Sequence, residues 1–343
     1  MLKQLLAIAY LTTRIGVIES PLHQHRERPQ LNIFLKAPFG FTKTSEILDL
    51  VEKGLAHIVL EHSEAGLLGS ARGGLYYKGD IINGANKLTV IDEYYLFESD
   101  ARRHLLTIMS HGFAKRTFQT FSKTNFSDRG EGWEIYGDSS GFLLKINTAI
   151  ALSTAVLERK ADAILEMIQS RCFNLNYSFS KSEALEILIG ERKAEKVEIE
   201  ELEKVDKVIL EENEAKYLAT QIDRHGFVPE DIGGYYMRAY WDMVKIASVF
   251  TIKNSREIIT KEDIDNAITF YPLHQLGFLG NKLTRNEIEV YMQCSCKTTN
   301  QIAQELNISQ RTVQRAINTL KELGLVKEMS ISGKTVYVKV IET

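Results

Sequence analysis

Short apolar runs alternate with segments of helical spacing along the first half of the chain. Four apolar runs are typical of buried strands, and they cover residues 33–35, 56–60, 88–91 and 149–154. Apolar residues three and four positions apart predict helices over residues 47–51 and 102–109. Strands that alternate with helices in this way indicate an α/β fold, in which the helices pack against a sheet.

The remaining stretches before residue 280 carry weaker patterns. The apolar residues 5–11 predict an amphipathic helix, which a polar loop follows up to about residue 30. Residues 111–150 alternate between apolar and polar positions and predict a hairpin with a long polar tip. The charge-rich stretch 181–220 predicts helix, and residues 271–280 are interpreted as a hinge.

Two further helix starts are marked by capping chemistry. One helix is predicted to end at residues 223–226, and the next to begin at Gly233-Gly234. Thr260 and Asp263 have the spacing of a capping box, in which each side chain accepts a backbone N–H of the other residue. We therefore expect a helix to begin directly after Thr260.

The C-terminal segment, from residue 282 onward, has the pattern of a winged helix. Helical spacing covers residues 288–291, 299–306 and 310–323, and a hairpin turns at residues 332–334. The third helix, capped by Ser309, has one apolar side and one polar and basic side. The apolar side is predicted to carry Val313, Ile317 and Leu320, and the polar side Gln310, Arg311, Gln314 and Arg315.

This polar side suits DNA recognition. Arginine and glutamine side chains match the base edges of the major groove and the phosphates, and Lys334 adds a cation in the hairpin. Winged helices also mediate protein contacts, so a protein partner stays an open alternative.

Composition narrows the function classes only slightly. The 343 residues carry a net charge of -3, so any DNA-binding surface has to be local. The length leaves room for two or three domains. Three cysteines are too few for a disulfide framework and favour a reducing compartment. No apolar run is long enough to cross a membrane, and we predict a cytoplasmic, DNA-associated protein without membrane contact.

The segment between the first strand and its helix has the pattern of a phosphate-binding loop. Its residues, all predicted to bind nucleotide, are Ala37, Pro38, Phe39, Gly40, Phe41, Thr42, Lys43 and Thr44. Lys43 would neutralise the β- and γ-phosphates of ATP, and the Thr44 hydroxyl would hold Mg²⁺. Ala37 and Thr42 stand where the general motif has glycine. The alternative is an ordinary strand, turn and helix with a surface lysine.

Two carboxylates follow the apolar strand at residues 88–91. In a nucleotide-hydrolysing sheet, Asp92 would order the Mg²⁺ shell, and Glu93 would polarise the attacking water. A strand that ends by chance in an acidic turn is the alternative. A lysine loop followed by an acidic strand end favours a nucleotide-binding fold.

The stretch between these two motifs carries a resemblance to a known family. The sequence Gly-Leu-Leu-Gly-Ser-Ala-Arg-Gly-Gly at residues 66–74, then Lys-Gly-Asp at residues 78–80 and Val-Ile-Asp-Glu at residues 90–93, resembles the AAA+ core of minichromosome maintenance (MCM) helicases. The phosphate loop of that family also departs from glycine at the position of Thr42, whereas it has glycine at that of Ala37. The resemblance implies a P-loop AAA+ core at residues 1–185, a helical lid at 186–279 and a winged helix at 280–343. The amino-terminal zinc and OB domain of the family is not expected before residue 31.

The resemblance also implies roles for single residues. Thr154, or the neighbouring Ser153, would contact the γ-phosphate at the end of a strand. Arg171 would act as an arginine finger on the nucleotide of a neighbouring subunit, and Arg238 as a second sensor on the lid. Lys115 and Arg116 would contact DNA from the hairpin. The alternatives are a helix-terminal arginine, an arginine beside aromatic residues and ordinary surface cations.

Three functions remain open at this point. The first is an ATP-dependent DNA motor or helicase of MCM type, which acts in DNA replication as a homo-oligomeric ring such as a hexamer. The second is a DNA-binding replication initiator or regulator with weak or no ATPase activity, which the imperfect phosphate loop favours. The third is a protein-remodelling ATPase whose winged helix binds a protein.

Overall fold

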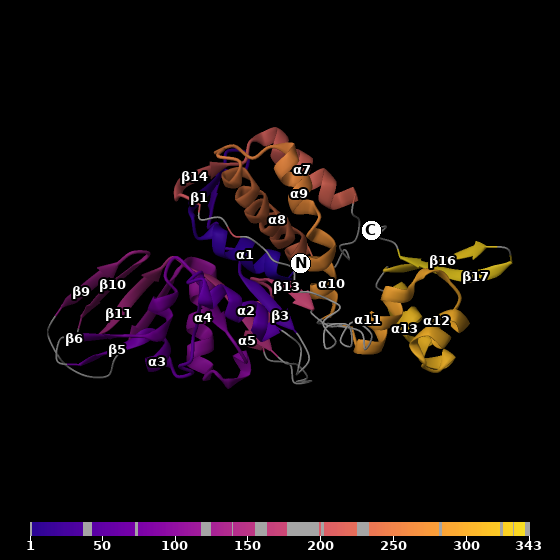
Figure 1. Ribbon diagram of the computed structural model, residues 1–343, viewed down its shortest axis with the longest axis horizontal. Coiled ribbons are helices and arrows are strands. Elements are labelled where there is room, and N and C mark those ends of the chain that lie inside the picture. The colour runs from indigo at the N-terminus through magenta and orange to yellow at the C-terminus, as the bar shows by residue number, and fades with distance from the viewer. Residues whose placement is uncertain are drawn as a thin grey trace.

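The computed structural model has an elongated shape, with a central body between an antiparallel sheet and the C-terminal domain (Figure 1). The described residues are 2–36, 43–72, 75–117, 125–138, 140–154, 163–176, 199, 202–224, 233–280, 283–322, 325–331 and 333–339. The predicted boundary between residues 185 and 186 lies outside them.

The central body contains a five-stranded sheet in the order β13-β3-β12-β7-β4, with all pairs parallel. Its strands are β3 (Ile33–Lys36), β4 (Ala56–Ile58), β7 (Leu88–Ile91), β12 (Ala149–Thr154) and β13 (Phe173–Asn176). The four strands predicted from apolar runs are therefore confirmed. Both faces of the sheet are buried, because Ile33 and Leu35 join one core cluster and Phe34 joins another.

Helices cover both faces of this sheet. Along the first face lie α1 (Leu2–Thr12) and α2 (Lys43–Glu52), which contribute to the same core cluster as Ile33. Against the second lie α4 (Ser99–His111) and α5 (Ala163–Gln169), which contact each other. Shorter elements connect the strands, namely α3 (Glu64–Leu68) and the 3-10 helices η1 (Asp80–Gly84) and η2 (Tyr94–Leu96).

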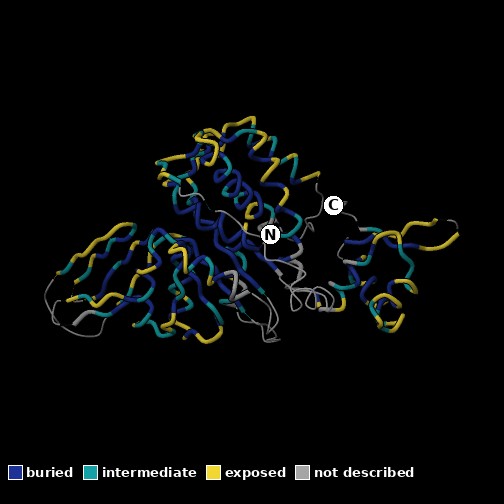
Figure 2. Tube along the Cα trace, viewed as in Figure 1, coloured by how far each residue is buried: buried dark blue, intermediate teal, exposed yellow. Residues whose placement is uncertain are grey.

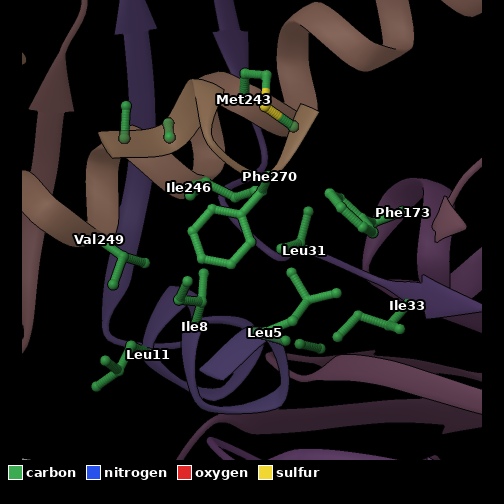
Figure 3. Packing of buried hydrophobic residues seen from close by; sticks show 14 of the residues in the cluster. Leu5, Ile8, Leu11, Leu31, Ile33, Phe173, Met243, Ile246, Val249 and Phe270 are labelled. Atoms are coloured by element: carbon green, nitrogen blue, oxygen red, sulfur yellow. The ribbon is translucent and has the colours of Figure 1, made fainter. Parts of the chain in front are cut away.

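Helix α1 is buried on almost every side. All of its residues except Gln4 are buried, and Figure 2 shows it as part of the dark interior. Figure 3 shows the reason: Leu5, Ile8 and Leu11 lie between the sheet and α8 (Gly233–Lys253). The expectation of an amphipathic helix here is wrong, since a helix enclosed by two layers needs no polar face.

Three segments differ from the sequence-based expectation. The predicted loop before residue 30 contains β1 (Ile15–Ser20) and β2 (His25–Glu27), because β1 pairs in parallel with β14 (Val205–Ile209). The same pairing makes residues 205–209 a strand instead of helix. The predicted hinge is helix α10 (Tyr271–Gly280), whose fully buried Tyr271 joins the main core.

The helices around α8 follow the predicted boundaries. Helix α7 (Glu212–Arg224) ends, and α8 begins, where expected. Helix α9 (Lys261–Ile268) carries the predicted capping box, in which Thr260 and Asp263 accept each other's backbone N–H.

A second sheet of four antiparallel strands stands at one end of the molecule, in the order β8-β11-β10-β9. Its strands are β8 (Phe113–Thr117), β9 (Phe126–Gly130), β10 (Trp133–Asp138) and β11 (Gly141–Ile146), and a hairpin of β5 (Gly69–Arg72) and β6 (Leu75–Lys78) lies beside them. The expected long polar tip thus contains two further strands. They form because Trp133 and Ile135 alternate with polar residues and pack into the core.

The C-terminal domain has its own hydrophobic core and the predicted winged-helix order. Its elements are α11 (Arg285–Gln293), β15 (Ser295–Lys297), α12 (Thr299–Leu306), α13 (Gln310–Glu322), β16 (Val326–Ile331) and β17 (Lys334–Lys339). Capping boxes begin α11 and α12, and Asn307 ends α12 in the left-handed region.

Candidate functional sites

The carboxyl edge of the central sheet brings the two predicted nucleotide motifs together. Lys43 begins α2 after β3, and Asp92 directly follows β7. Only β12 separates these two strands. At a spacing of about 4.8 Å per strand, the ends of β3 and β7 lie roughly 10 Å apart, a distance that a phosphate group with its metal ion can bridge.

This edge is also where the chain connections change direction. The connection through α2 leads from β3 to β4, whereas the one through α5 leads from β12 to β13 on the other side. β3 and β12 are neighbours, and such a change of direction at the carboxyl ends of a parallel sheet is the position where α/β proteins bind ligands.

Two features distinguish the acidic strand end from an ordinary turn. The Ser153 hydroxyl of β12 donates a hydrogen bond to Asp92 Oδ1, which fixes this carboxylate against the neighbouring strand. Glu93 has a φ of 56°, in the left-handed region that non-glycine residues rarely adopt. Such strain is concentrated at functional sites, because the surrounding structure has to enforce it.

The structure describes only some of the other residues predicted for this site. Residues 37–42 of the phosphate loop, which include Ala37, Pro38, Phe39, Gly40, Phe41 and Thr42, lie outside the described part, as do the side chains of Lys43 and Thr44. Thr154 ends β12 with Lys36 as its partner on β3. Burial lowers the pKa of Lys36, so a second lysine lies at low dielectric beside the loop.

The two predicted arginines lie at the opposite edge of the sheet. Arg171 precedes β13, whose first residue Phe173 pairs with Ile33 at the start of β3. Arg171 Nη1 donates to the Met167 carbonyl at 2.7 Å, and Arg238 donates to the Ser170 carbonyl. Strands of four to six residues place this edge roughly 13 Å or more from Asp92.

These arginines are close enough to influence each other. Burial lowers the pKa of Arg171, and the nearby positive charge of Arg238 lowers it further. The two guanidinium groups therefore form one cationic position, remote from the acidic pair of their own chain.

The predicted hairpin cations differ in their surroundings. Lys115 is exposed on β8. The Arg116 side chain is only 15% exposed, and its Nε lies 3.0 Å from Glu64 Oε2. This ion pair ties β8 to α3 and speaks against the predicted DNA contact of Arg116, because its charge is directed inward.

The exposed side of α13 forms a second candidate site. Val313, Ile317 and Leu320 are buried in the domain core, as predicted. The polar residues on the other side are all exposed, and they are Gln310, Arg311, Gln314, Arg315 and Asn318. Gln314 donates to Asn318 at 3.1 Å, and Gln310 donates to Thr299 at 3.2 Å. These contacts order the amides on a surface that faces solvent.

The hairpin of β16 and β17 is fixed beside this helix. Lys321 Nζ lies 2.6 Å from Glu328 Oε1, which links α13 to β16. Lys334 is exposed at the start of β17. Arg311, Arg315 and Lys334 have no ion-pair partner among the described residues, so their charges are available to an anionic ligand.

Charge is distributed unevenly along the chain. Residues 280–343 contain nine lysines and arginines against six acidic residues, a net charge of +3. Since the whole chain carries -3, residues 1–279 carry -6. The C-terminal domain is therefore the part that attracts nucleic acid over distance.

Sequence reasoning missed one surface, the open face of the four-stranded sheet. Its exposed aromatic residues Phe113 and Tyr136 alternate with core residues of the same strands. The two-residue alternation within residues 133–138 was the available signal, but these residues were assigned to a polar tip.

Among the described residues, no three His, Cys, Asp or Glu side chains gather as a metal-binding group. No helix in the described ranges is both long and apolar enough to span a bilayer.

Comparison with known proteins identifies the C-terminal domain. A family model described as an HTH domain matches residues 297–338, which cover the last residue of β15, all of α12 and α13, and most of the hairpin. No curated protein matches the chain in a sequence search. The HTH match supports DNA binding, whereas the resemblance of the body to MCM proteins stays a prediction.

Proposed function

We propose that this chain is a DNA-binding protein of the regulator or replication-initiator type, whose α/β body binds ATP with Mg²⁺. The observation that carries the DNA-binding part is the exposed row of basic and amide side chains on α13, within the segment that matches the HTH family. Helices of this kind enter the major groove in helix-turn-helix proteins.

Each part of the winged helix has a role in this proposal. Arg311 and Arg315 contact phosphates or guanine edges, and Gln310 and Gln314 read adenine edges. Lys334 contacts the backbone from the hairpin. Leu320 of α13 and Val326 of the hairpin are buried in the same domain core, so the helix and the hairpin reach the duplex together.

The nucleotide part is supported by the geometry of the carboxyl edge. Lys43 lies at a helix start, where the backbone amides and the helix dipole favour phosphate. Thr44 and Asp92 would hold the metal ion, which compensates phosphate charge, and Glu93 would orient a water molecule. The Ser153–Asp92 hydrogen bond holds the carboxylate at the carboxyl edge of the sheet.

A second candidate function is an ATP-driven DNA motor that works as a ring of identical chains. The observation that favours it is the joint position of Arg171 and Arg238 at the amino edge of the sheet. From there they cannot serve the nucleotide of their own chain, but they suit the γ-phosphate of a neighbour. Such a contribution in trans is worth about 10³-fold or more in rate.

One set of measurements separates these functions. Purified protein is tested for duplex DNA binding at low and moderate salt, and for ATP hydrolysis with and without DNA. Particle mass is measured with a non-hydrolysable ATP analogue. DNA binding without turnover or ring formation supports the regulator, whereas DNA-stimulated turnover by a ring supports the motor. Absence of DNA binding refutes the main proposal.

A further inference from the structure

The four-stranded antiparallel sheet has one buried and one open face. On the buried face, Trp133, Ile135, Phe142 and Leu144 join the core cluster that also covers the central sheet. The alternate positions of the same strands point to the other side, which no helix covers in the described part of the chain, and Figure 2 shows exposed stretches along these strands.

Strand register arranges the open face as two rows of side chains. One row crosses the strands from Lys115 through Leu143 and Tyr136 to Ser127. The next row runs from Phe113 through Lys145 and Glu134 to Arg129. Each row therefore combines one aromatic ring with at least one cation.

Both aromatic rings are accessible. Tyr136 is 50% exposed and Phe113 is 37% exposed, although exposed sheet positions need no aromatic residue for packing. His111 stacks on Phe113 with ring centroids 5.6 Å apart. Lys145 Nζ lies 5.7 Å from the centroid of the Tyr136 ring, within the range of a cation–π contact.

The charges of the two rows are predominantly positive. Lys115, Lys145 and Arg129 are three cations against two carboxylates, that of Glu134 within the rows and that of Asp138 at the rim, close to Lys115. The Glu134 carboxylate already accepts the Tyr136 hydroxyl at 3.0 Å and lies 3.8 Å from Lys145 Nζ. Asp138, at the rim, accepts hydrogen bonds from Ser140 in the turn. The face thus keeps positive charge for a ligand.

A hollow of about 560 Å³ lies along the first row, and all four residues of that row contribute to its lining. The hollow is shallow and open to solvent, so a flat ring can lie against the Tyr136 ring from outside.

We propose that this open face binds single-stranded nucleic acid, with bases stacked on Phe113 and Tyr136 and phosphates beside Lys115, Lys145 and Arg129. Two strands and two residues separate the rings, a distance of about 12 Å that leaves room for nucleotides between two stacked bases. Exposed sheets with aromatic platforms bind unpaired strands because only unstacked bases offer their ring faces. This site is independent of the winged helix and of ATP binding.

The test uses the full chain and a labelled oligo(dT) of about 20 nucleotides, a length that spans the site sizes of single-strand binders. We expect the double variant Phe113→Ala/Tyr136→Ala to bind this strand at least about tenfold more weakly, since each stacked base contributes about 1–3 kcal/mol. Binding to duplex DNA, which the winged helix provides, should stay within twofold. An oligo(U) arm tells whether the ligand is DNA or RNA.

Matched variants sharpen the result. Tyr95→Ala removes a tyrosine with a similar exposure of 43% elsewhere on the chain and should leave single-strand binding unchanged. Tyr136→Phe keeps the ring but loses the hydrogen bond to Glu134, so affinity should be retained. Lys145→Gln should reduce the dependence of log K on log salt by about 0.7.

Two outcomes overturn the proposal. One is unchanged oligo(dT) and oligo(U) binding in the double variant, with binding lost instead in Arg311→Ala/Arg315→Ala. The other is equal loss in Tyr136→Phe and Tyr136→Ala, which excludes stacking. Circular dichroism and thermal melting check the fold, and if the double variant does not fold, Tyr136→Phe and Lys145→Gln decide the question.

Discussion

The winged helix and the α/β body assemble their candidate sites in different ways. The side chains proposed to contact DNA come from α13, a single helix of 13 residues, and the hairpin beside it. The proposed nucleotide site would combine Lys43, Asp92 and Ser153, which come from three strands and their connections. A local site depends on one helix being folded, whereas a distributed site depends on strand order. Substitutions in one region should therefore leave the other intact.

The largest effect is expected from Lys43→Ala. Removal of the charge at the start of α2 should abolish ATP binding, and with it any turnover, because no other group would occupy the same position against the β- and γ-phosphates. The measurement is binding of a labelled ATP analogue by the purified chain, with duplex DNA binding as a parallel readout. Lys53→Ala, at a half-exposed lysine after the same helix, is the control and should retain ATP binding. Unchanged ATP binding in Lys43→Ala would refute the nucleotide site.

A smaller effect, confined to the other region, should follow from Ile317→Ala. The Ile317 side chain is fully buried in the separate core of the C-terminal domain. Its truncation should destabilise that domain by about 2–5 kcal/mol and abolish DNA binding, while ATP binding persists. Calorimetry should show one early transition and one unchanged transition. A single shifted transition for the whole molecule would show that the two cores unfold together.

Loss of one recognition cation should weaken DNA binding without unfolding the domain. Arg311→Ala and Arg315→Ala should each weaken duplex binding by about 1–3 kcal/mol and lower its salt dependence. Lys321→Ala is the matched control on the same helix, because its charge is already paired with Glu328. Salt titrations of duplex affinity provide the measurement, and equal losses in all three variants would contradict this role of α13.

The smallest effect concerns pH and lies in the body. Burial alone would raise the pKa of Asp80, but hydrogen bonds from the Leu60 N–H, His57 and Asn83 outweigh it and hold the pKa below 3.8. A lowered folded-state pKa stabilises the fold above 3.8, and this contribution disappears as the pH falls through the folded-state value. Asp80→Asn should cost about 1 kcal/mol at pH 7 and nothing in strong acid. Urea unfolding at several pH values tests this, and a constant difference would refute it.

Local signals explain what the sequence predicted well. The strands β3, β7 and β12 are continuous apolar runs, because both faces of the sheet are covered. The capping box at Thr260 and the amphipathic pattern of α13 are likewise encoded within a few residues. The winged helix could therefore be predicted almost completely, including which side of α13 is exposed.

Contacts between distant segments explain what was missed. Strand β1 forms because it pairs with β14, which lies far along the chain, and no local sequence pattern predicts this pairing. The ion pair of Arg116 was equally unpredictable from local sequence, because its acidic partner Glu64 belongs to another segment. Arg171 and Arg238 are far apart in the sequence. Predicting that they lie at one edge of the sheet would have required the strand order.

The enclosed position of α1 has a consequence for synthesis of the chain. Helix α1 leaves the ribosome well before the helix that covers it, because α8 ends only at Lys253. Until then an apolar segment with almost no polar face stays without its partner and can associate with other nascent chains. From this order of appearance, we expect α1 to need protection during translation until α8 has formed.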